Sequence, residues 1–332
     1  MFIHDRIAGS IFGALCGDAL GARYEFKKSN KVVELINQDI GKENFLDILG
    51  AGPHNVMPGQ ITDDSELGLG LIFSVIEYGY YNQKHAGNIY IKWFKSNPFD
   101  IGSTTSKAFQ KANTASDIIE NSKHQNKNSL SNGCLMRSFG LGVLASCQDD
   151  EKIKTLARLD CIMTNPNKIA IDAVTVYIAT IGELIKTGSK HKAYERAKRI
   201  CETKEVMNFI EKGHKGSTEV NINLRGECVI GKIDCEFQGF LGIGLQLCFY
   251  ELFHGDSYYS SIIRTITRGG DTDTNACIVG GVLGAYYGIG SIPDRWKQKV
   301  RKCDNPRKYV YKPCNQNHID NMINKLYELI IF

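Results

Sequence analysis

The chain has 332 residues, of which 42% are hydrophobic and 23% are charged, and its formal net charge is +4. These values are typical of a soluble globular protein, and the charge is too small to indicate nucleic-acid binding by itself. The eleven cysteines include no C-x-x-C pair, which argues against a disulfide framework or a zinc site and favours a reducing compartment, the cytoplasm.

Helical spacing of apolar residues dominates the chain, and alternating apolar and polar runs are scarce. No proline- or serine-rich linker divides the sequence, so we expect one compact all-α domain over residues 1–332. The predicted helices are, in chain order, Asp5–Ala22, Asp64–Tyr80, Ala86–Lys95, Thr104–Ala112, Cys134–Ser146, Asp149–Met163, Lys168–Thr187, His191–Ile210, Phe240–His254, Tyr258–Thr267, Asn275–Tyr287 and Asn317–Ile330. The polar segment Asn121–Asn132 is expected to be an exposed loop.

The apolar N-terminus imitates a signal peptide. However, glycines interrupt its apolar run, and Asp18 lies where a cleavage region would be. The longest uncharged stretch, around Ala276–Gly290, is too short and too rich in glycine for a transmembrane helix. We therefore expect neither a signal peptide nor a membrane-spanning segment.

Glycine recurs every four residues along two predicted helical segments, at Gly9, Gly13, Gly17 and Gly21, and at Gly280, Gly284 and Gly288. This spacing places each set on one helix face, and each helical glycine costs about 1 kcal/mol relative to alanine. Close backbone approach would offset that cost. We therefore expect the two helices to pack together in the core, which would bring Asp18 and Glu25 toward Asp271 and Asp273. Two unrelated helices that tolerate glycine are the alternative.

Two acidic segments each precede an apolar helix. The first is Gln60–Glu66, with the sequence QITDDSE, and the second is Arg268–Thr274, with the sequence RGGDTDT. Taken alone, the first could be a capping box in which Asp63 caps the helix and Glu66 follows three residues later. If the two segments converge, however, four carboxylates share one site, and that site requires a counter-charge.

Divalent cations are the expected counter-charge, because Arg268 is the only basic residue within either acidic segment. The candidate ligands are all oxygens, which favour Mg²⁺ or Mn²⁺, or Ca²⁺, over zinc, and four negative charges suit two such ions. These candidates are Thr62, Asp63, Asp64, Asp271, Asp273 and Thr274. Helical prenyl-diphosphate enzymes also use acidic metal motifs, but those motifs require acids where this chain has Leu67 and Val279.

With these motifs the sequence resembles the ADP-ribosylglycohydrolase family, in particular the branch typified by dinitrogenase reductase-activating glycohydrolase. The resemblance runs almost end to end, and TDDS followed by GGDTDT is its most specific element. The matching segments are GALCGDALGARYEF (13–26), GQITDDSELGLGL (59–71), FDIGSTT (99–105), SNGCLMRSFGLGV (131–143), RGGDTDTNACIVGGVLGAYYG (268–288) and IPDRW (292–296). The resemblance implies an all-α, single-domain fold with a central site for two Mg²⁺ or Mn²⁺ ions.

The resemblance also implies roles for individual residues. The six oxygen-bearing candidates would be metal ligands, Glu25 would lie beside the metals, and Asp63 or Glu25 would take a proton from the attacking water. The implied substrate-binding residues are Ser103, Ser131, Asn132, Gly133, Met136, Arg137, Asn165 and Gly270. The loop Ser131–Gly133 would hold the diphosphate, since N–H groups ahead of a helix suit phosphate oxygens. An ordinary asparagine-capped helix is the alternative for this loop.

The implied reaction is hydrolysis at the anomeric carbon of the distal ribose in ADP-ribosylated protein, which releases ADP-ribose. The transition state carries positive charge on the sugar, which nearby carboxylates would stabilise. An arginine-linked acceptor is favoured, because its guanidinium is already cationic. We expect a monomer with no membrane partner.

Two positions depart from the family pattern. Asn165 stands where many relatives carry a ligand-contacting histidine, and Ser103 stands where some carry an acid. Two alternatives therefore remain: an inactive ADP-ribose-binding protein, and a hydrolase of serine-linked or nucleic-acid-linked ADP-ribose. The basic segment Pro293–Cys314 gives the nucleic-acid linkage limited support, although a solvated helix face and tail is the simpler interpretation. The remaining histidines of interest, His4, His54 and His254, are interpreted as surface or packing residues.

Overall fold

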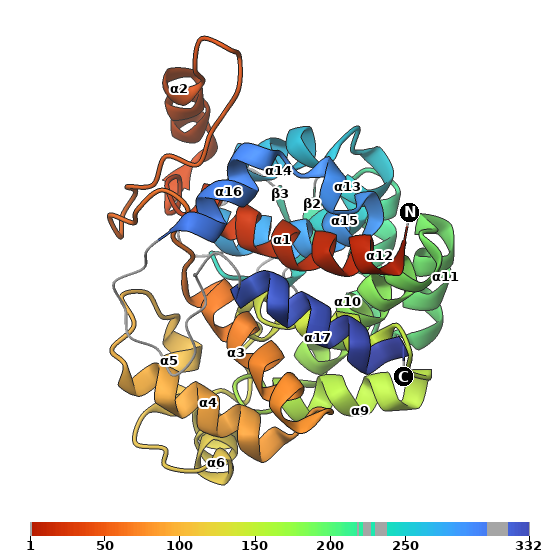
Figure 1. Ribbon diagram of the computed structural model, residues 1–332. Coiled ribbons are helices and arrows are strands. Elements are labelled where there is room, and N and C mark those ends of the chain that lie inside the picture. Colours follow the sequence, from red (N-terminus) through yellow and green to blue (C-terminus); the bar gives the residue numbers. More distant parts are fainter. Residues whose placement is uncertain (1, 218, 222–226, 230–237, 304–317, 332) are drawn as a thin grey trace.

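The computed structural model describes residues 2–217, 219–221, 227–229, 238–303 and 318–331, and it is mainly α-helical (Figure 1). The all-α prediction is therefore confirmed. The helices are α1 (Ile3–Gly21), α2 (Ser29–Asp39), α3 (Asp63–Tyr78), α4 (Gln83–Lys95), α5 (Ser103–Phe109), α6 (Ala115–Gln125), α7 (Gly133–Met136), α8 (Phe139–Ala145), α9 (Asp150–Cys161), α10 (Lys168–Thr187), α11 (Lys190–Ile200), α12 (Lys204–His214), α13 (Leu241–His254), α14 (Tyr258–Ile266), α15 (Thr272–Tyr287), α16 (Asp294–Lys302) and α17 (His318–Ile331). A short 3₁₀ helix, η1, spans Ile289–Ser291.

Four short strands form two antiparallel pairs. The strand β1 (Lys27–Lys28) pairs with β4 (Gly269–Gly270), and β2 (Glu219–Asn221) pairs with β3 (Glu227–Val229). The first pair joins segments that are far apart in the sequence, and it lies directly beside both Glu25 and the GGDTDT motif. It therefore positions the candidate site.

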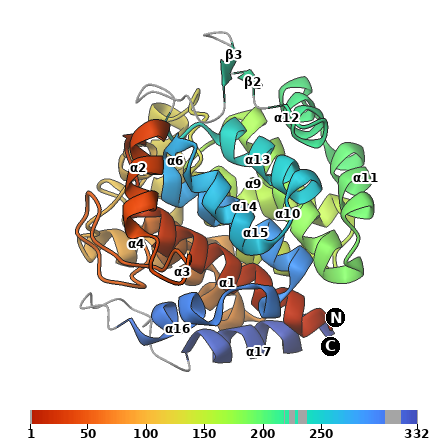
Figure 2. The same cartoon turned by 90° about the horizontal axis from the view of Figure 1, so that it is seen from above.

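The two glycine-rich helices, α1 and α15, pack against each other in the core, as predicted (Figures 1 and 2). A Cβ atom added at Gly13 would lie 2.2 Å from the carbonyl oxygen of Gly280, and one added at Gly284 would lie 1.9 Å from that of Gly9. The glycines therefore allow a backbone approach that any larger residue would prevent. The Tyr258 hydroxyl donates to the Gly13 carbonyl at 2.7 Å, which supplies a partner for a buried oxygen on the same face.

The other helices surround this pair (Figure 2). The helices α13 and α14 pack on α15, α10 packs on α8, α9, α11 and α15, and α3 packs on α4 and α8. The C-terminal helix α17 contacts both α1 and α3. By contrast, α2 extends away from the helical body and contacts mainly β1 and β4 (Figure 1).

Several boundaries differ from the prediction. The helices α2 and α6 were not predicted, α16 was expected only as a solvated helix face within Pro293–Cys314, and the segment 191–210 divides into α11 and α12. The division occurs where the carboxylate of Asp172 accepts the backbone N–H groups of Glu202 and Thr203. The loop predicted at Asn121–Asn132 is wrong in its first part, because α6 continues to Gln125 and Asn126 is buried.

Asn126 is buried within a segment that otherwise remains largely exposed. Its Nδ2 donates to the carbonyl oxygens of Thr104 and Thr164, at 2.8 and 3.0 Å. A buried amide is tolerated when its hydrogen-bonding groups have partners. The polar composition of the segment therefore did not reveal that Asn126 is buried.

None of the helices in the described part of the chain is long and apolar enough to cross a membrane. Cysteines whose side chains the structure describes are free thiols. Within the basic segment, α16 buries Trp296 and Val300, so this part is an amphipathic helix. Residues 304–314 of the same segment lie outside the described residues.

Candidate active site

The first acidic motif begins helix α3, and a residue from α1 caps that helix. The backbone N–H groups of Thr62 and Ser65 donate to the Asp18 carboxylate at 3.1 and 3.2 Å. The Thr62 hydroxyl oxygen lies 2.9 Å from the same carboxylate. The capping-box interpretation is therefore wrong. Asp63 is the first residue of α3, and the Glu66 carboxylate accepts from the indole N–H of Trp93 at 2.6 Å.

The second acidic motif is positioned by its two glycines. Gly269 and Gly270 have φ values of 76° and 78°, a region that favours glycine, and they pair with Lys28 and Lys27 respectively. The turn places Asp271 at the N-terminus of α15. The same pairing holds Glu25, which precedes β1, next to the motif.

The predicted convergence of the two motifs is confirmed. Ligand atoms of Asp18, Asp64 and Asp273 lie within 4.8 Å of one another, and so do those of Glu25, Asp271 and Asp273. All five side chains are buried. The close packing of α1 against α15 and the capping of α3 by α1 therefore bring the carboxylates together at one point in the core.

Burial and mutual repulsion make this site electrostatically unfavourable without a counter-charge. Desolvation, followed by the charge of Asp271, raises the pKa of Glu25 to about 10. Burial raises the pKa of Asp18 to about 6, although its hydrogen bonds from Ser65 and Thr62 oppose the increase. The pKa values of Asp63, Asp64 and Asp273 are also well above the ordinary range, because of burial and the neighbouring carboxylates.

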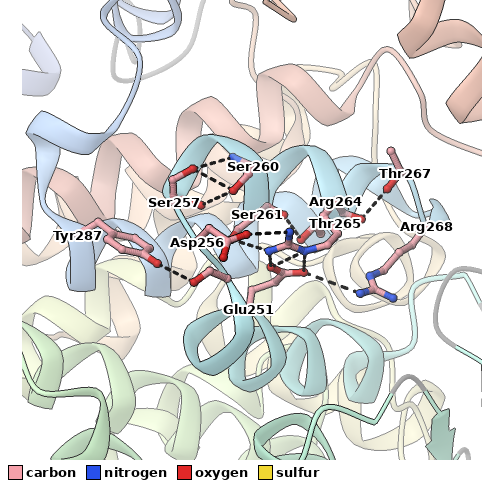
Figure 3. Close-up of polar contacts among 11 residues, drawn as sticks. Glu251, Asp256, Ser257, Ser260, Ser261, Arg264, Thr265, Thr267, Arg268 and Tyr287 are labelled. Carbon is pink, nitrogen blue, oxygen red and sulfur yellow. Dashed lines mark hydrogen bonds and ion pairs between the residues drawn. The ribbon is translucent and has the colours of Figure 1, made fainter.

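The one basic residue of the motifs does not supply that counter-charge. Figure 3 shows Arg268 directed toward Glu251, whose carboxylate lies 3.8 Å from its guanidinium. Arg264 binds the same buried carboxylate at 2.7 Å, and the Arg268 guanidinium also lies over the Tyr250 ring. Arg268 is therefore engaged outside the acidic cluster, where it stabilises the approach to the GGDTDT turn.

The chemistry of the donor atoms fits hard divalent cations. Asp64 Oδ1 is buried and has no hydrogen-bond partner among the described residues. Unpartnered buried carboxylate oxygens are costly unless a cation coordinates them. The donor atoms of this carboxylate cluster, which we call the inner cluster, are all oxygens, and Mg²⁺ and Mn²⁺ prefer oxygen ligands.

Next to the carboxylates lies a cavity of about 340 Å³, a size suited to a small-molecule ligand. Its lining includes ten residues that the sequence predicted for the site: Glu25, Asp63, Ser103, Ser131, Asn132, Gly133, Met136, Asp271, Asp273 and Thr274. Asn132 connects the loop to the acids, because its Nδ2 donates to Asp271 Oδ2 at 2.7 Å. The loop and the carboxylates therefore line the same cavity.

The other predicted residues do not line this cavity. Thr62 and Asp64 lie deeper, where the Thr62 hydroxyl is 2.8 Å from Asp64 Oδ2. Gly270 lies in β4, where its carbonyl accepts the N–H of Phe26 at 2.9 Å. Asn165 is buried and donates to the carbonyl oxygen of Ser131 at 3.2 Å.

Arg137 is fully buried and supports the loop from behind. Its guanidinium binds Asp160 at 2.9 Å and donates to the Gly133 carbonyl and the Thr164 hydroxyl, each at 2.9 Å. Arg137 and Asn165 thus contact the loop that lines the cavity, and not the cavity itself. Any effect of these two side chains on a ligand would therefore act through the position of this loop.

Sequence reasoning missed two ionisable residues near the cavity. Asp100 lines it, three residues before Ser103, so the FDIGSTT segment does supply a carboxylate. His54, interpreted from sequence as a surface or packing histidine, lies 3.3 Å from Glu25 and 3.6 Å from Asp100. Asp100 lies within FDIGSTT, a segment already matched to the family, so the sequence could have indicated it. His54 lies in an irregular loop, where no sequence pattern indicated a role.

Comparisons with known proteins agree with this geometry. The family model described as ADP-ribosylglycohydrolase matches residues 2–331. The chain is 32% identical over 317 residues to the ADP-ribosyl glycohydrolase homologue L543 of Acanthamoeba polyphaga mimivirus, covering 93% of this chain and 94% of that protein. It is 25% identical over 302 residues to ADP-ribosyl-[dinitrogen reductase] glycohydrolase of Rhodospirillum rubrum, covering 90% and 91%.

A solved structure has the same fold. A chain of an ADP-ribosylglycohydrolase-related protein complex superposes with a TM-score of 0.74 at 22% sequence identity, covering 99% of each chain. The similarity therefore extends over the whole architecture and is not confined to the acidic motifs.

Proposed function

This chain belongs to the ADP-ribosylglycohydrolase family, and we propose that it is a divalent-cation-dependent hydrolase that releases ADP-ribose from protein side chains. It would act as a single-domain monomer. The observation that carries the proposal is the meeting of buried carboxylates from α3 and α15 beside a cavity of ligand size. Such a cluster is costly to maintain in a protein that has no use for a cation.

The six residues Thr62, Asp63, Asp64, Asp271, Asp273 and Thr274 would hold two Mg²⁺ or Mn²⁺ ions. When bound, the ions would offset the charge of the carboxylates and orient a water molecule and the ribose hydroxyls. The buried Asp64 Oδ1 supports this assignment, because it accepts no hydrogen bond from the described residues and a cation could coordinate it.

Asp63 and Glu25 are the two candidates for the general base. Both line the cavity, so either could reach a water molecule beside the sugar. The bond that breaks joins the anomeric carbon to the acceptor side chain, and positive charge develops on the sugar. The remaining carboxylates, including Asp100, would stabilise that charge.

The loop Ser131–Gly133 would bind the diphosphate of ADP-ribose. Its position is defined on both sides, because the Asn132 N–H donates to the Gly239 carbonyl at 2.7 Å and Arg137 holds the carbonyl of Gly133. A loop fixed in this way presents groups to a ligand without a large ordering cost on binding.

Arginine is the favoured acceptor. Glu25, Asp100 and Asp271 line the cavity, and no lysine or arginine does so among the described residues. A guanidinium is attracted to such a surface and can leave without a proton from a general acid. A serine acceptor would need that proton.

The test compares arginine-linked and serine-linked ADP-ribosyl proteins with Mg²⁺ or Mn²⁺ present. Wild type should release ADP-ribose from the arginine-linked substrate, and Asp273→Ala should not. The control is Asp294→Ala, a substitution of an exposed acid. Release from the serine-linked substrate alone would overturn the acceptor assignment. Binding of ADP-ribose without release from either would favour the inactive binding protein.

A further inference from the structure

A second group of metal-ligating side chains lies beside the cavity, which two of its three members, Glu25 and Asp100, line. His54 Nε2 is 3.3 Å from Glu25 Oε2 and 3.6 Å from Asp100 Oδ2. The side chains are 21%, 6% and 14% exposed respectively, so the group is largely shielded but remains accessible. The three residues come from separate segments of the chain and meet only in the folded protein.

An ordinary hydrogen bond does not account for this contact. His54 Nε2 and Glu25 Oε2 are buried atoms without a hydrogen-bond partner among the described residues, although they lie next to each other. Ligand atoms about 2.0 to 2.2 Å from a shared cation lie roughly 3 to 3.5 Å apart, close to the separations seen. The ligand atoms of all three residues lie within 4.8 Å of one another.

The donor set differs from that of the inner cluster. An imidazole nitrogen with two carboxylate oxygens suits zinc and related transition-metal ions better than Mg²⁺. The Phe26 and Phe99 rings lie against the imidazole, with centroids 6.2 and 5.8 Å away, and limit its movement.

We propose that His54, Glu25 and Asp100 form an outer site for a divalent transition-metal ion of the Zn²⁺ class. Glu25 also belongs to the inner group with Asp271 and Asp273, so the two sites share one carboxylate. Occupation of the outer site engages Glu25 and thereby inhibits hydrolysis, a consequence that rests on the proposed function. The binding itself does not depend on any activity.

Direct binding is the first test. Zn²⁺ is titrated calorimetrically into the full chain in excess Mg²⁺, which occupies the inner cluster. Wild type and the control His124→Gln, which changes an exposed histidine, should show one binding event that His54→Gln lacks. Because all three proteins keep every cysteine, binding to thiols cancels in the comparison.

Asp100→Asn provides an independent second variant, and it should lose the same event while its circular dichroism remains that of the wild type. Zn²⁺ binding by His54→Gln with the stoichiometry and affinity of the wild type would overturn the outer site.

Inhibition is the second test. Zn²⁺ should slow ADP-ribose release by wild type, and it should slow His54→Gln much less, each relative to its own rate without Zn²⁺. Equal inhibition of both proteins would overturn the regulatory role. A wild type that binds Zn²⁺ through His54 but hydrolyses nothing would sink the proposed function and leave the outer site intact.

Discussion

Asp18 links the core helix α1 to the acidic start of α3. Its carboxylate accepts two backbone N–H groups, and the Thr62 hydroxyl lies within 3 Å of both Asp18 and Asp64. That hydroxyl has a single proton. If it donates to Asp18, its lone pairs remain free to face a cation, so Asp18 orients the candidate ligand Thr62 in addition to placing its own carboxylate in the cluster.

Asp18→Asn should therefore weaken cation binding. The amide group brings N–H donors against the N–H groups of Thr62 and Ser65, and it disturbs the orientation of Thr62. We expect Mn²⁺ affinity to fall by about 10-fold to 100-fold, as for other residues that support metal ligands. Calorimetric titration with Mn²⁺ measures the loss, and Ser10→Ala, another buried polar site on α1, is the control. Wild-type affinity in Asp18→Asn would refute this role.

Arg137 was predicted from sequence to bind the substrate, but it forms a buried ion pair with Asp160 that supports the fold. Removing one partner of a buried ion pair leaves an uncompensated charge, so Arg137→Ala should lower the free energy of unfolding by about 3 to 5 kcal/mol. Asp160→Ala should do the same, which chemical denaturation of both variants can measure. If Arg137→Ala weakens ADP-ribose binding and leaves stability unchanged, Arg137 contacts the ligand directly.

At the scale of elements, the contact between α1 and α15 fixes the position of the acidic cluster. A Cβ atom at Gly280 would lie 2.1 Å from the Gly13 carbonyl oxygen, and backbone cannot move aside as a side chain can. Gly280→Ala should therefore lower the free energy of unfolding by about 3 kcal/mol or more, at the upper end of the cost of overpacking.

Gly290 provides the matched control for that substitution. A Cβ atom there meets nothing within 4 Å, so Gly290→Ala should change stability by less than about 0.5 kcal/mol. Urea denaturation of both variants makes the comparison. Equal stabilities would mean that the two helices can separate at no cost and that the glycine spacing has another cause.

The sequence predicted the elements whose apolar pattern is strong and missed those whose pattern is weak. Helix α2 buries only Val32 and Ile36, and α16 is so rich in charge that it was interpreted as a solvated helix face, although it buries Trp296 and Val300. The approach of Asp18 and Glu25 to Asp271 and Asp273 could be predicted because glycine spacing indicated that α1 and α15 meet. The cap by Asp18 and the contact between His54 and Glu25 could not, because both depend on tertiary positions that no local pattern encodes.

At the scale of the whole molecule, the buried carboxylates make the metal-free protein sensitive to pH. Carboxyl groups in the unfolded chain titrate near about pH 4. In the folded protein the pKa values of Asp18 and Glu25 are raised to about 6 and about 10. Their contribution to stability is therefore fully present below about pH 4 and is lost as pH rises through the two folded-state values.

Thermal unfolding in a chelator should thus show a melting temperature that falls between about pH 5 and about pH 8. Mn²⁺ should restore it, with a larger increase at the higher pH, because the cation competes with protons for the same oxygens. A chelated protein that melts at one temperature throughout this range, with or without Mn²⁺, would contradict the electrostatic account of the cluster.

The number of Mn²⁺ ions bound per chain shows whether α3 and α15 build one cation site together. Equilibrium binding should give about two ions for wild type. Asp63→Ala, on α3, and Asp273→Ala, on α15, should each reduce binding, because each removes a carboxylate from the shared cluster. Failure of the wild-type chain to bind Mn²⁺, or undiminished binding by both variants, would contradict the account.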